Sequence, residues 1–294
     1  MHMKNIGGQA VIEGVMMKSP SHWTVAVRGH KGDIHLKKEK LRPLPAALKL
    51  PLLRGVVALF QALVLGVKAI EFSAGKAYEE ESEEPLSKLS IALTIAASFL
   101  LGIGLFILLP LYATKLFGMV VSHVATSSFV FNLTDGVIRV LIFLLYVLAI
   151  GLWKEMARIF MYHGAEHKVI HAYEAGRELT LESVRDYSPL HPRCGTSFLM
   201  IVMVVSILIF SFIPQYWPFI YKFAARVILI PLIAGTSFEL LKLSARWKDN
   251  AFMNLMIQPG LLLQRLTTRE PDDAQIEVAI SALAEVLKME EGHA

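Results

Sequence analysis

Residues 89–114 read LSIALTIAASFLLGIGLFILLPLYAT, an almost unbroken apolar run. A helix needs roughly 20 such residues to cross the hydrocarbon core of a bilayer. The rest of the chain agrees, because 54% of its 294 residues are hydrophobic, 18% are charged and the mean hydropathy is +0.52. Soluble domains carry about 25% charged residues. We therefore expect an integral membrane protein.

Three further runs are predicted to span the membrane, which makes about four transmembrane helices in all. They cover residues 137–161, 197–217 and 223–243. The fourth span is the weakest because it holds Arg226 and Glu239. We expect Arg226 to extend toward the outer surface. A carboxylate within a span is a functional candidate by default, although a salt bridge from Glu239 to a nearby base is an equal alternative.

The distribution of Lys and Arg predicts the orientation. Basic residues gather before residue 55, between the second and third spans and after the fourth, whereas loops 115–136 and 214–222 hold one Lys each. Cytosolic loops of membrane proteins are enriched in Lys and Arg. With four spans, this pattern predicts a multi-pass protein of the bacterial cytoplasmic membrane with both termini in the cytosol.

The regions outside the spans indicate the domain organisation. Residues 1–49 are predicted to form a small polar domain with a β-hairpin around the loop at 29–33. Residues 50–85 hold an amphipathic helix, at 51–75, and an acidic linker. Residues 86–249 form the transmembrane region, with a cytosolic loop at 162–197. Residues 250–294 form a cytosolic tail whose helix begins near Asp272 or Asp273. The predicted fold class is an all-α membrane bundle plus a β-containing N-terminal domain.

Charge and cysteine content exclude several classes of protein. A formal net charge of +4 is too weak to indicate a nucleic-acid partner. The single cysteine, Cys194, excludes an intramolecular disulfide and leaves a thiol for metal binding or for packing. The expected partners are the lipid bilayer and either another membrane protein or a second copy of this chain, on which the tail helix could dock.

The residues that follow the second span carry the chemistry. Residues 162–174 read YHGAEHKVIHAYE. In a continuous helix His163, His167 and His171 lie one turn apart on one face, with Glu174 on the same stripe. Imidazoles at positions i and i+4 can bind one metal ion. His163 to His167 also matches the pattern H-x-x-E-H, in which Glu166 takes a proton from zinc-activated water.

A second cluster precedes the third span, where residues 191–197 read HPRCGTS. If the two spans are neighbours, His191 or Cys194 completes the site that His163 and His167 begin, because imidazole and thiolate are both good zinc ligands. The alternative is a structural role, with histidines at the membrane surface and Cys194 as a small packing residue.

Four segments resemble the YqhQ-like family of bacterial membrane proteins. They are the segments GGQAVIEGVMM at 7–17, YHGAEHK at 162–168, HPRCGTS at 191–197 and TTREPDD at 267–273. The resemblance covers nearly the whole chain and implies a cytoplasmic-membrane location. The family is often labelled as metal-dependent enzymes, which agrees with the ligand set above, but no substrate or reaction is implied.

Two functional hypotheses follow. In the first, the protein is a membrane-embedded, zinc-dependent hydrolase, with Glu166 as general base and the metal bound by His163, His167 and His191 or Cys194. In the second, it is a non-enzymatic factor that binds or regulates a membrane complex, and the His/Cys cluster is structural. A transporter is less favoured, because the spans offer few polar groups for a path.

Overall fold

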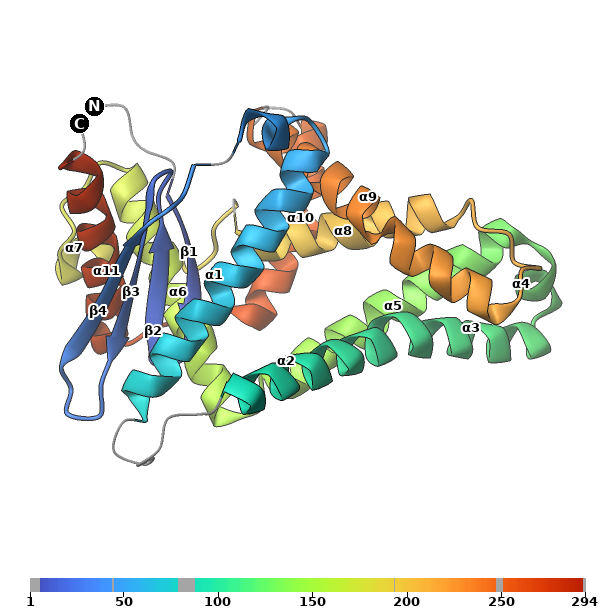
Figure 1. The fold of residues 1–294 in the computed structure, drawn as a ribbon, viewed down its shortest axis with the longest axis horizontal. Coiled ribbons are helices and arrows are strands. Elements are labelled where there is room, and N and C mark those ends of the chain that lie inside the picture. Colours follow the sequence, from blue (N-terminus) through green and yellow to red (C-terminus); the bar gives the residue numbers. More distant parts are fainter. Residues whose placement is uncertain (1–5, 44, 79–87, 193, 247–250, 293–294) are drawn as a thin grey trace.

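The computed structural model describes residues 6–43, 45–78, 88–192, 194–246 and 251–292 (Figure 1). The N-terminal part is an antiparallel sheet with the strand order β1-β2-β3-β4. The predicted hairpin is confirmed as β3–β4, and the glycine-rich segment that precedes it supplies β1 and the turn into β2. The strands are β1 (Gly7–Val11), β2 (Gly14–Lys18), β3 (His22–Arg28) and β4 (Ile34–Lys40).

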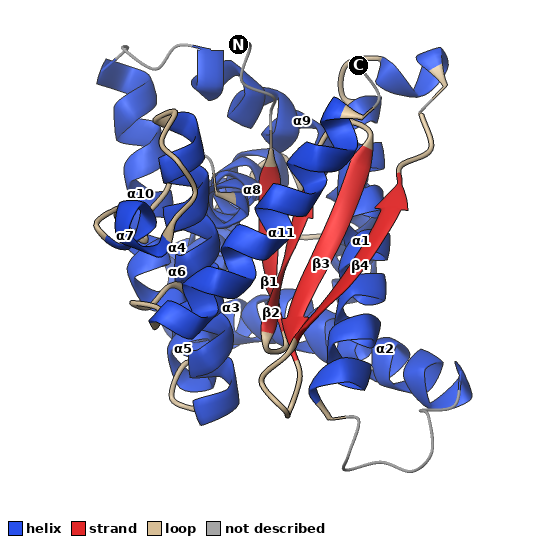
Figure 2. Cartoon of the chain, turned by 90° about the vertical axis from the view of Figure 1, so that its left-hand side faces the viewer, coloured by secondary structure: helices blue, strands red, loops and turns tan. Residues whose placement is uncertain are grey.

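Helices cover both faces of this sheet (Figure 2). On one face lie α6 (Lys154–Glu174), α7 (Leu181–Arg185) and α11 (Asp273–Glu291), and on the other lies α1 (Leu53–Ala77), which follows the short helix η1 (Ala46–Lys49). Side chains alternate between the faces of a strand. Accordingly, Met17 of β2 packs among residues of α6 and α11, whereas its neighbour Met16 packs with Leu65 of α1.

The apolar helices extend away from the sheet. Figure 1 places α4 and the α8–α9 loop at one end of the molecule, with the sheet and α11 at the other. The helices are α2 (Lys88–Ile103), the π-helical segment η2 (Gly104–Leu108), α3 (Leu109–Val120), α4 (Ser122–Thr126), α5 (Ser128–Ile150), α8 (Gly195–Phe210), α9 (Phe219–Arg246) and α10 (Ala251–Thr267).

Among the described residues, four helical segments are long and apolar enough to cross a membrane, judged by length and composition. They are Leu53–Ala77, Ala92–Val120, Ser128–Ile150 and Phe219–Leu243, and the apolar helix α8 is shorter. The number of segments agrees with the number of predicted spans, but the segments themselves are not the same. The segment predicted as an interfacial helix, now α1, meets the criterion, whereas the predicted third span does not.

The predicted boundaries of the second and third spans are wrong. The helix predicted over 137–161 runs over Ser128–Ile150, and α6 is a separate helix because Trp153 adopts an extended conformation. The helix predicted to reach residue 217 ends at Phe210, four residues before Pro214. Proline disfavours helical conformation in the residue before it, which explains why α8 and α9 remain separate helices.

Helix α1 lies between the sheet and an exposed apolar surface. Leu65 and Ala69 are buried against the sheet, whereas Leu59, Phe60 and Leu63 on other faces are 42%, 66% and 46% exposed. In Figure 1, α1 runs in a different direction from α2 and α9.

Charged residues of α1 and α9 hold the two helices together. The Arg54 Nε donates to Glu239 Oε1 at 2.7 Å. Of the two alternatives for Glu239, the structure shows a salt bridge. Its partner is Arg54, a residue distant in sequence, whereas the expected partner was a nearby base, Lys242 or Arg246. This ion pair fastens the start of α1 to the last third of α9.

A buried ionic cluster joins α5, α8 and α9. Asp135 Oδ2 accepts a hydrogen bond from Arg139 Nη2, and it lies 3.1 Å from Arg226 Nη2. Arg226 also donates to Asn132 Oδ1 at 3.1 Å and is 0% exposed. The expectation that Arg226 extends to the outer surface is therefore wrong. Its guanidinium instead lies inside the bundle, because Asp135 on the neighbouring helix supplies a counter-charge.

The C-terminal helix confirms its predicted start. Asp272 caps α11, accepting from the Gln275 backbone N–H at 2.8 Å, and the Gln275 side chain accepts from the Asp272 N–H at 3.0 Å. Reciprocal bonds of this kind satisfy two of the free N–H groups at a helix start. The tail region also contains α10, a helix that the sequence pattern did not predict.

Near the end of α11, Glu290 holds the β2–β3 turn. Its carboxylate accepts hydrogen bonds from Ser19 Oγ at 2.6 Å, from the Ser21 N–H at 3.0 Å and from His22 Nδ1 at 3.1 Å. Burial by itself raises the pKa of Glu290, but these hydrogen bonds outweigh burial and lower the pKa to about 2.

Replacing Glu290 with glutamine is expected to destabilise the fold by about 1–3 kcal/mol, because hydrogen bonds to a charged group contribute about this much. The folded-state pKa lies below the ordinary value of 4.5. The contribution is therefore fully present above pH 4.5 and is lost as the pH falls toward 2. Thermal unfolding of both proteins from pH 7 to pH 3 measures this difference. A gap that stays constant over this range would contradict the assignment.

Candidate metal centre

Helix α6 carries the predicted histidine stripe. His163, His167 and His171 lie within one continuous helix, as the spacing predicted, although a break at residues 151–153 separates this helix from α5. One face of α6 packs into the core that the sheet and α11 share. The histidine side chains meet Pro189, Leu190 and Cys194, and Thr267 at the end of α10.

Three of the predicted ligands converge. A nitrogen of His163, a nitrogen of His167 and the Cys194 Sγ lie within 4.8 Å of one another. The His163 Nε2 is 3.2 Å from the sulfur, and the two imidazole centroids are 4.4 Å apart. Zinc bonds of about 2.0–2.3 Å to nitrogen and sulfur place neighbouring ligand atoms about 3.5 Å apart. This trio, His163, His167 and Cys194, therefore has the spacing of a metal site.

Backbone carbonyls orient both imidazoles. The His163 Nδ1 donates to the Thr267 carbonyl at 2.8 Å, and the His167 Nδ1 donates to the Pro189 carbonyl at 2.6 Å. A ring nitrogen that donates in this way leaves the lone pair of the other nitrogen for a metal, which is the usual arrangement around ligating histidines. Each Nε2 is therefore available to a metal.

The His167 Nε2 is buried and has no hydrogen-bond partner among the described residues. Burial, followed by the nearby imidazole of His163, lowers the pKa of His167 to about 2, so that the ring is neutral. Buried polar atoms in folded proteins are almost always satisfied. A neutral imidazole whose remaining nitrogen faces a thiol and a second imidazole fits the requirement for a metal ligand.

Cys194 is placed by helix α8. It is the N-cap residue, and its sulfur accepts hydrogen bonds from the Thr196 Oγ1 at 3.2 Å and the Thr196 N–H at 3.4 Å. Burial raises the pKa of the thiol, and the two hydrogen bonds from Thr196 oppose this effect. The positive end of the helix dipole also favours a thiolate. Only the thiolate form binds a metal.

Glu166 lies beside the trio. It is 4% exposed, and its Oε2 is 3.5 Å from the His167 Nε2. Burial raises the pKa of Glu166 to about 8, opposed by the nearby imidazole of His163 and by a hydrogen bond from the Gly8 backbone N–H. A carboxylate at this distance is placed to exchange a proton with a molecule next to the trio.

The other three predicted ligands form an adjacent group. The His171 Nε2 donates to the Leu190 carbonyl at 2.9 Å, and the His191 Nε2 is 3.4 Å from Glu174 Oε2. The His171 and His191 rings are 4.5 Å apart. None of these three residues belongs to the trio. Of the two candidates for the third ligand, His191 and Cys194, it is therefore Cys194 that lies with His163 and His167.

Residues from the end of α10 complete the frame, and the sequence pattern did not identify them. The Gln264 side chain makes two hydrogen bonds of 2.8 Å with the His191 backbone. The segment after α10 lies tightly against α6, since a Cβ on Gly164 would lie 2.1 Å from the Arg269 carbonyl oxygen. From the TTREPDD segment, the atom at the site is the backbone carbonyl oxygen of Thr267. Every residue has such a carbonyl, so the side chains of the segment do not indicate this role.

Gly8 is a further residue that the pattern missed as part of the site. A Cβ at this position would lie 2.6 Å from the Glu166 Cγ, so that the backbone of β1 touches the carboxylate side chain directly. The signal was the Gly7-Gly8 pair at the start of an edge strand, where glycine often marks a close approach. By contrast, Glu13 does not reach the site, and its carboxylate pairs with Arg158 instead, at 2.6 Å.

Replacing Gly8 with alanine is expected to lower the melting temperature by several degrees, because overpacking a filled site costs about 1–3 kcal/mol. The matched control is Gly7→Ala, since a Cβ at Gly7 meets nothing within 4 Å. Thermal unfolding of the two variants checks this. Equal melting temperatures would show that Glu166 moves aside without cost.

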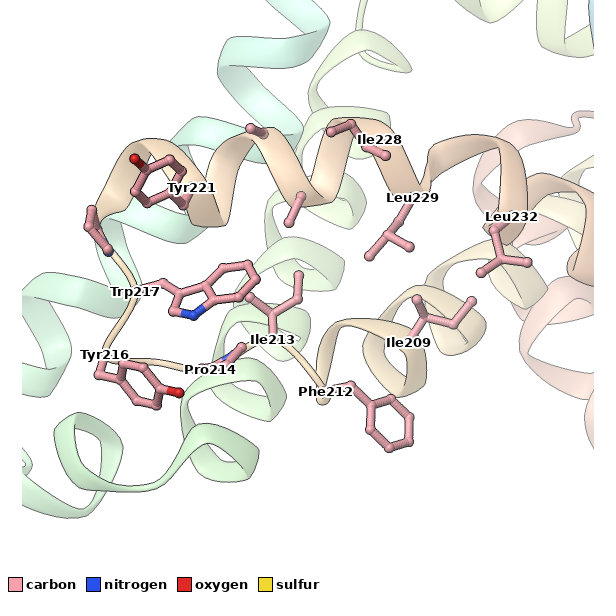
Figure 3. A pocket seen from close by; sticks show the side chains of 13 residues that line it. Ile209, Phe212, Ile213, Pro214, Tyr216, Trp217, Tyr221, Ile228, Leu229 and Leu232 are labelled. Carbon is pink, nitrogen blue, oxygen red and sulfur yellow. The ribbon is translucent and has the colours of Figure 1, made fainter.

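The site opens on a cavity of about 890 Å³. Glu166, His167 and Cys194 line it, together with residues of β1, β2, α1 and α9. A larger apolar groove of about 1220 Å³ lies at the far end of α8 and α9 (Figure 3). Its lining contains no carboxylate, imidazole, thiol or amine, so the smaller cavity is the one equipped for chemistry.

Comparison with known proteins identifies the family. Residues 50–289 match the family described as "Protein of unknown function (DUF1385)". The chain is 35% identical over 303 residues to "Uncharacterized protein YqhQ" of Bacillus subtilis (strain 168), covering 97% of this chain and 92% of that protein. No solved structure gives a significant match. The YqhQ-like resemblance is thus confirmed, and the chain belongs to the DUF1385 family.

Proposed function

We propose that this protein is a zinc-dependent hydrolase that works at the cytosolic face of the bacterial cytoplasmic membrane. The observation that carries the proposal is the trio of His163, His167 and Cys194, with both imidazoles oriented by carbonyls and Glu166 beside them. The chemistry of this ligand set, two neutral imidazoles and one thiol, suits zinc.

The number of ligands favours a catalytic site over a structural one. Structural zinc sites are closed by four protein ligands, whereas catalytic sites use three and keep one position open. Within the described part of the chain, three groups form the cluster, and His191 faces Glu174 instead. The cavity beside the trio leaves room for a substrate.

Each residue then has a defined task. Zinc, when bound, supplies a Lewis acid that activates water near neutral pH. Glu166, in the carboxylate form that the positive charge of bound zinc would favour, accepts a proton beside the trio and returns it to the leaving group. Gly8 holds the Glu166 carboxylate in place, and the carbonyls of Thr267 and Pro189 keep both imidazoles in the ligating tautomer.

The proposed arrangement in the membrane has four crossings. They are the α2–α3 segment, α5, α8 with the residues that follow it, and α9, while α1 lies along the cytosolic surface. Two observations support this arrangement. The loops with few basic residues lie at the end of the molecule opposite the sheet (Figure 1), and α1 runs in a different direction from α2 and α9. The sheet, α6 and α11 are then cytosolic, as are both termini.

A structural zinc site in a non-enzymatic membrane factor is the second candidate. The observation that favours it is the position of Cys194, which caps α8 and would keep a structural role with or without a metal. In that case the Glu166 side chain only fills space in the interior, and its replacement leaves every interaction with a partner protein intact.

The test is elemental analysis of the detergent-purified protein together with hydrolysis of chromogenic carboxylic ester, phosphodiester and peptide probes. We expect about one zinc ion per chain and turnover that a chelator abolishes and added zinc restores. Zinc-free protein would overturn the proposal, and bound zinc without turnover on any probe would favour the structural candidate.

Replacing Glu166 with glutamine is expected to leave the zinc content unchanged and to lower turnover by about 10²–10⁴-fold, the usual contribution of a general base. Glutamine keeps the size of the side chain but cannot accept the proton. The matched control is Glu174→Gln, which changes a cavity-lining carboxylate outside the trio. Loss of zinc from the Glu166 variant would make this residue a ligand rather than a base.

A further inference from the structure

The cavity beside Glu166 has two kinds of lining. Ala62 and Leu65 of α1, with Phe238 and Leu241 of α9, supply an apolar part. Glu166, His167 and Cys194, together with the adjacent His171 and His191, supply a polar part. A cavity of about 890 Å³ falls within the usual size range of small-molecule sites, roughly 300–1,000 Å³. Its ligand must therefore be amphipathic.

Helix α1 places the apolar part next to an outward-facing apolar surface. The same turns of α1 that line the cavity expose Leu59, Phe60 and Leu63. In the proposed arrangement α1 lies along the cytosolic membrane surface, which would place these exposed side chains among the acyl chains. A molecule that is partly in the bilayer thus has its apolar part at the same level as Ala62 and Leu65.

Two lysines complete the lining. Lys18, at the end of β2, is half-buried and makes no ion pair within the described part of the chain, and Lys242 lies at the cytosolic part of α9. Burial lowers the pKa of Lys18, which shows the cost of leaving its charge without a partner. The carboxylates that share the lining are Glu166 and Glu174, and Glu174 already faces His191 at 3.4 Å.

We propose that this cavity binds an anionic lipid phosphate, with the phosphate at Lys18 and the acyl chain against α1 and α9. The lipid phosphate would be the substrate class of the proposed hydrolase, so the fate of the bound lipid rests on the proposed function. Binding itself depends on Lys18 and on the apolar lining, and it does not require the metal.

The experiment compares three probes on the detergent-purified, full-length protein. Dioleoyl phosphatidic acid has both the phosphate and the chains, dioleoylglycerol lacks the phosphate, and glycerol 3-phosphate lacks the chains. Affinity is measured by the rise in melting temperature with probe concentration. Only phosphatidic acid is expected to stabilise the protein, and Lys18→Ala is expected to weaken its binding by about tenfold, as for the loss of a charge-assisted hydrogen bond.

Two further variants test whether the effects on binding are specific to the proposed site. Lys40→Ala removes the same charge from β4, the opposite edge of the sheet, and is expected to leave affinity within about twofold. Ala62→Trp fills the apolar part from an exposed position of α1 and is expected to weaken binding of phosphatidic acid with an unchanged zinc content. The melting temperature without any probe shows that each variant is folded.

The outcomes separate this inference from the proposed function. Equal stabilisation by dioleoylglycerol, or by glycerol 3-phosphate, would overturn it, and so would an unchanged affinity in Lys18→Ala. If zinc is present and phosphatidic acid does not bind, the lipid site fails and the zinc site stands. If phosphatidic acid binds through Lys18 to protein that carries no zinc, the lipid site stands and the hydrolase proposal fails.

Discussion

Replacing His167 with alanine is expected to reduce bound zinc from about one ion per chain to below about a tenth of that. Weakening even the groups that orient ligating histidines costs roughly 10–100-fold in metal affinity, and removal of a ligand costs more. The His167 Nε2 is buried beside His163 and Cys194 and has no hydrogen-bond partner among the described residues, so that no neighbouring nitrogen replaces it. Elemental analysis of the purified variant measures the loss.

The same helix supplies a matched control. His171 lies one turn beyond His167, but its Nε2 donates to the Leu190 carbonyl. His171→Ala should therefore keep its zinc, whereas Cys194→Ser should lose it, because serine is a poor zinc ligand. Gel filtration confirms that each variant is folded. If His171→Ala loses as much zinc as His167→Ala, or if Cys194→Ser keeps it, the trio is not the metal site.

Replacing Asp135 with alanine is expected to destabilise the protein by about 3–5 kcal/mol, which is the cost of removing one partner of a buried ion pair. Asp135 is 0% exposed and contacts both Arg139 and Arg226. Its removal leaves two guanidinium groups inside the bundle without a counter-charge. Thermal unfolding in detergent and the yield of monodisperse protein measure the effect.

Two controls test whether the uncompensated charge is the cause. Asp273→Ala breaks an ion pair with Arg185 whose side chains are both more than half exposed, and it should cost less than about 1 kcal/mol. Replacing Asp135, Arg139 and Arg226 together with alanine, methionine and methionine should recover much of the loss, because apolar residues can replace a buried ionic group. A stable Asp135→Ala variant would mean that another anion or water reaches the arginines.

Local patterns in the chain were sufficient for several elements. The histidine stripe of α6 follows from helical periodicity, the β3–β4 hairpin from two β-prone runs around a Gly-containing loop, and the start of α11 from the Asp272 cap. Each of these depends on residues that are close in sequence. The apolar run at 89–114 was equally clear, because length and hydropathy alone indicate a helix that can span a membrane, although the helical segment extends to Val120.

Interactions between distant segments decided the rest. The sequence alone could not choose between His191 and Cys194 as the third ligand, because the choice depends on the folded arrangement, in which Cys194 meets His163 and His191 faces Glu174. The carbonyls that orient the two histidines are also distant in sequence, with Pro189 lying 22 residues from His167 and Thr267 lying 104 residues from His163. The burial of Arg226 depends on Asp135 of another helix, and the position of Glu166 depends on Gly8 of the edge strand. Helical spacing is a local property, so the amino-acid order is enough to identify the groups that can act as ligands. Which of these groups meet depends on the folded chain, because backbone carbonyls and distant counter-charges leave no periodic signal.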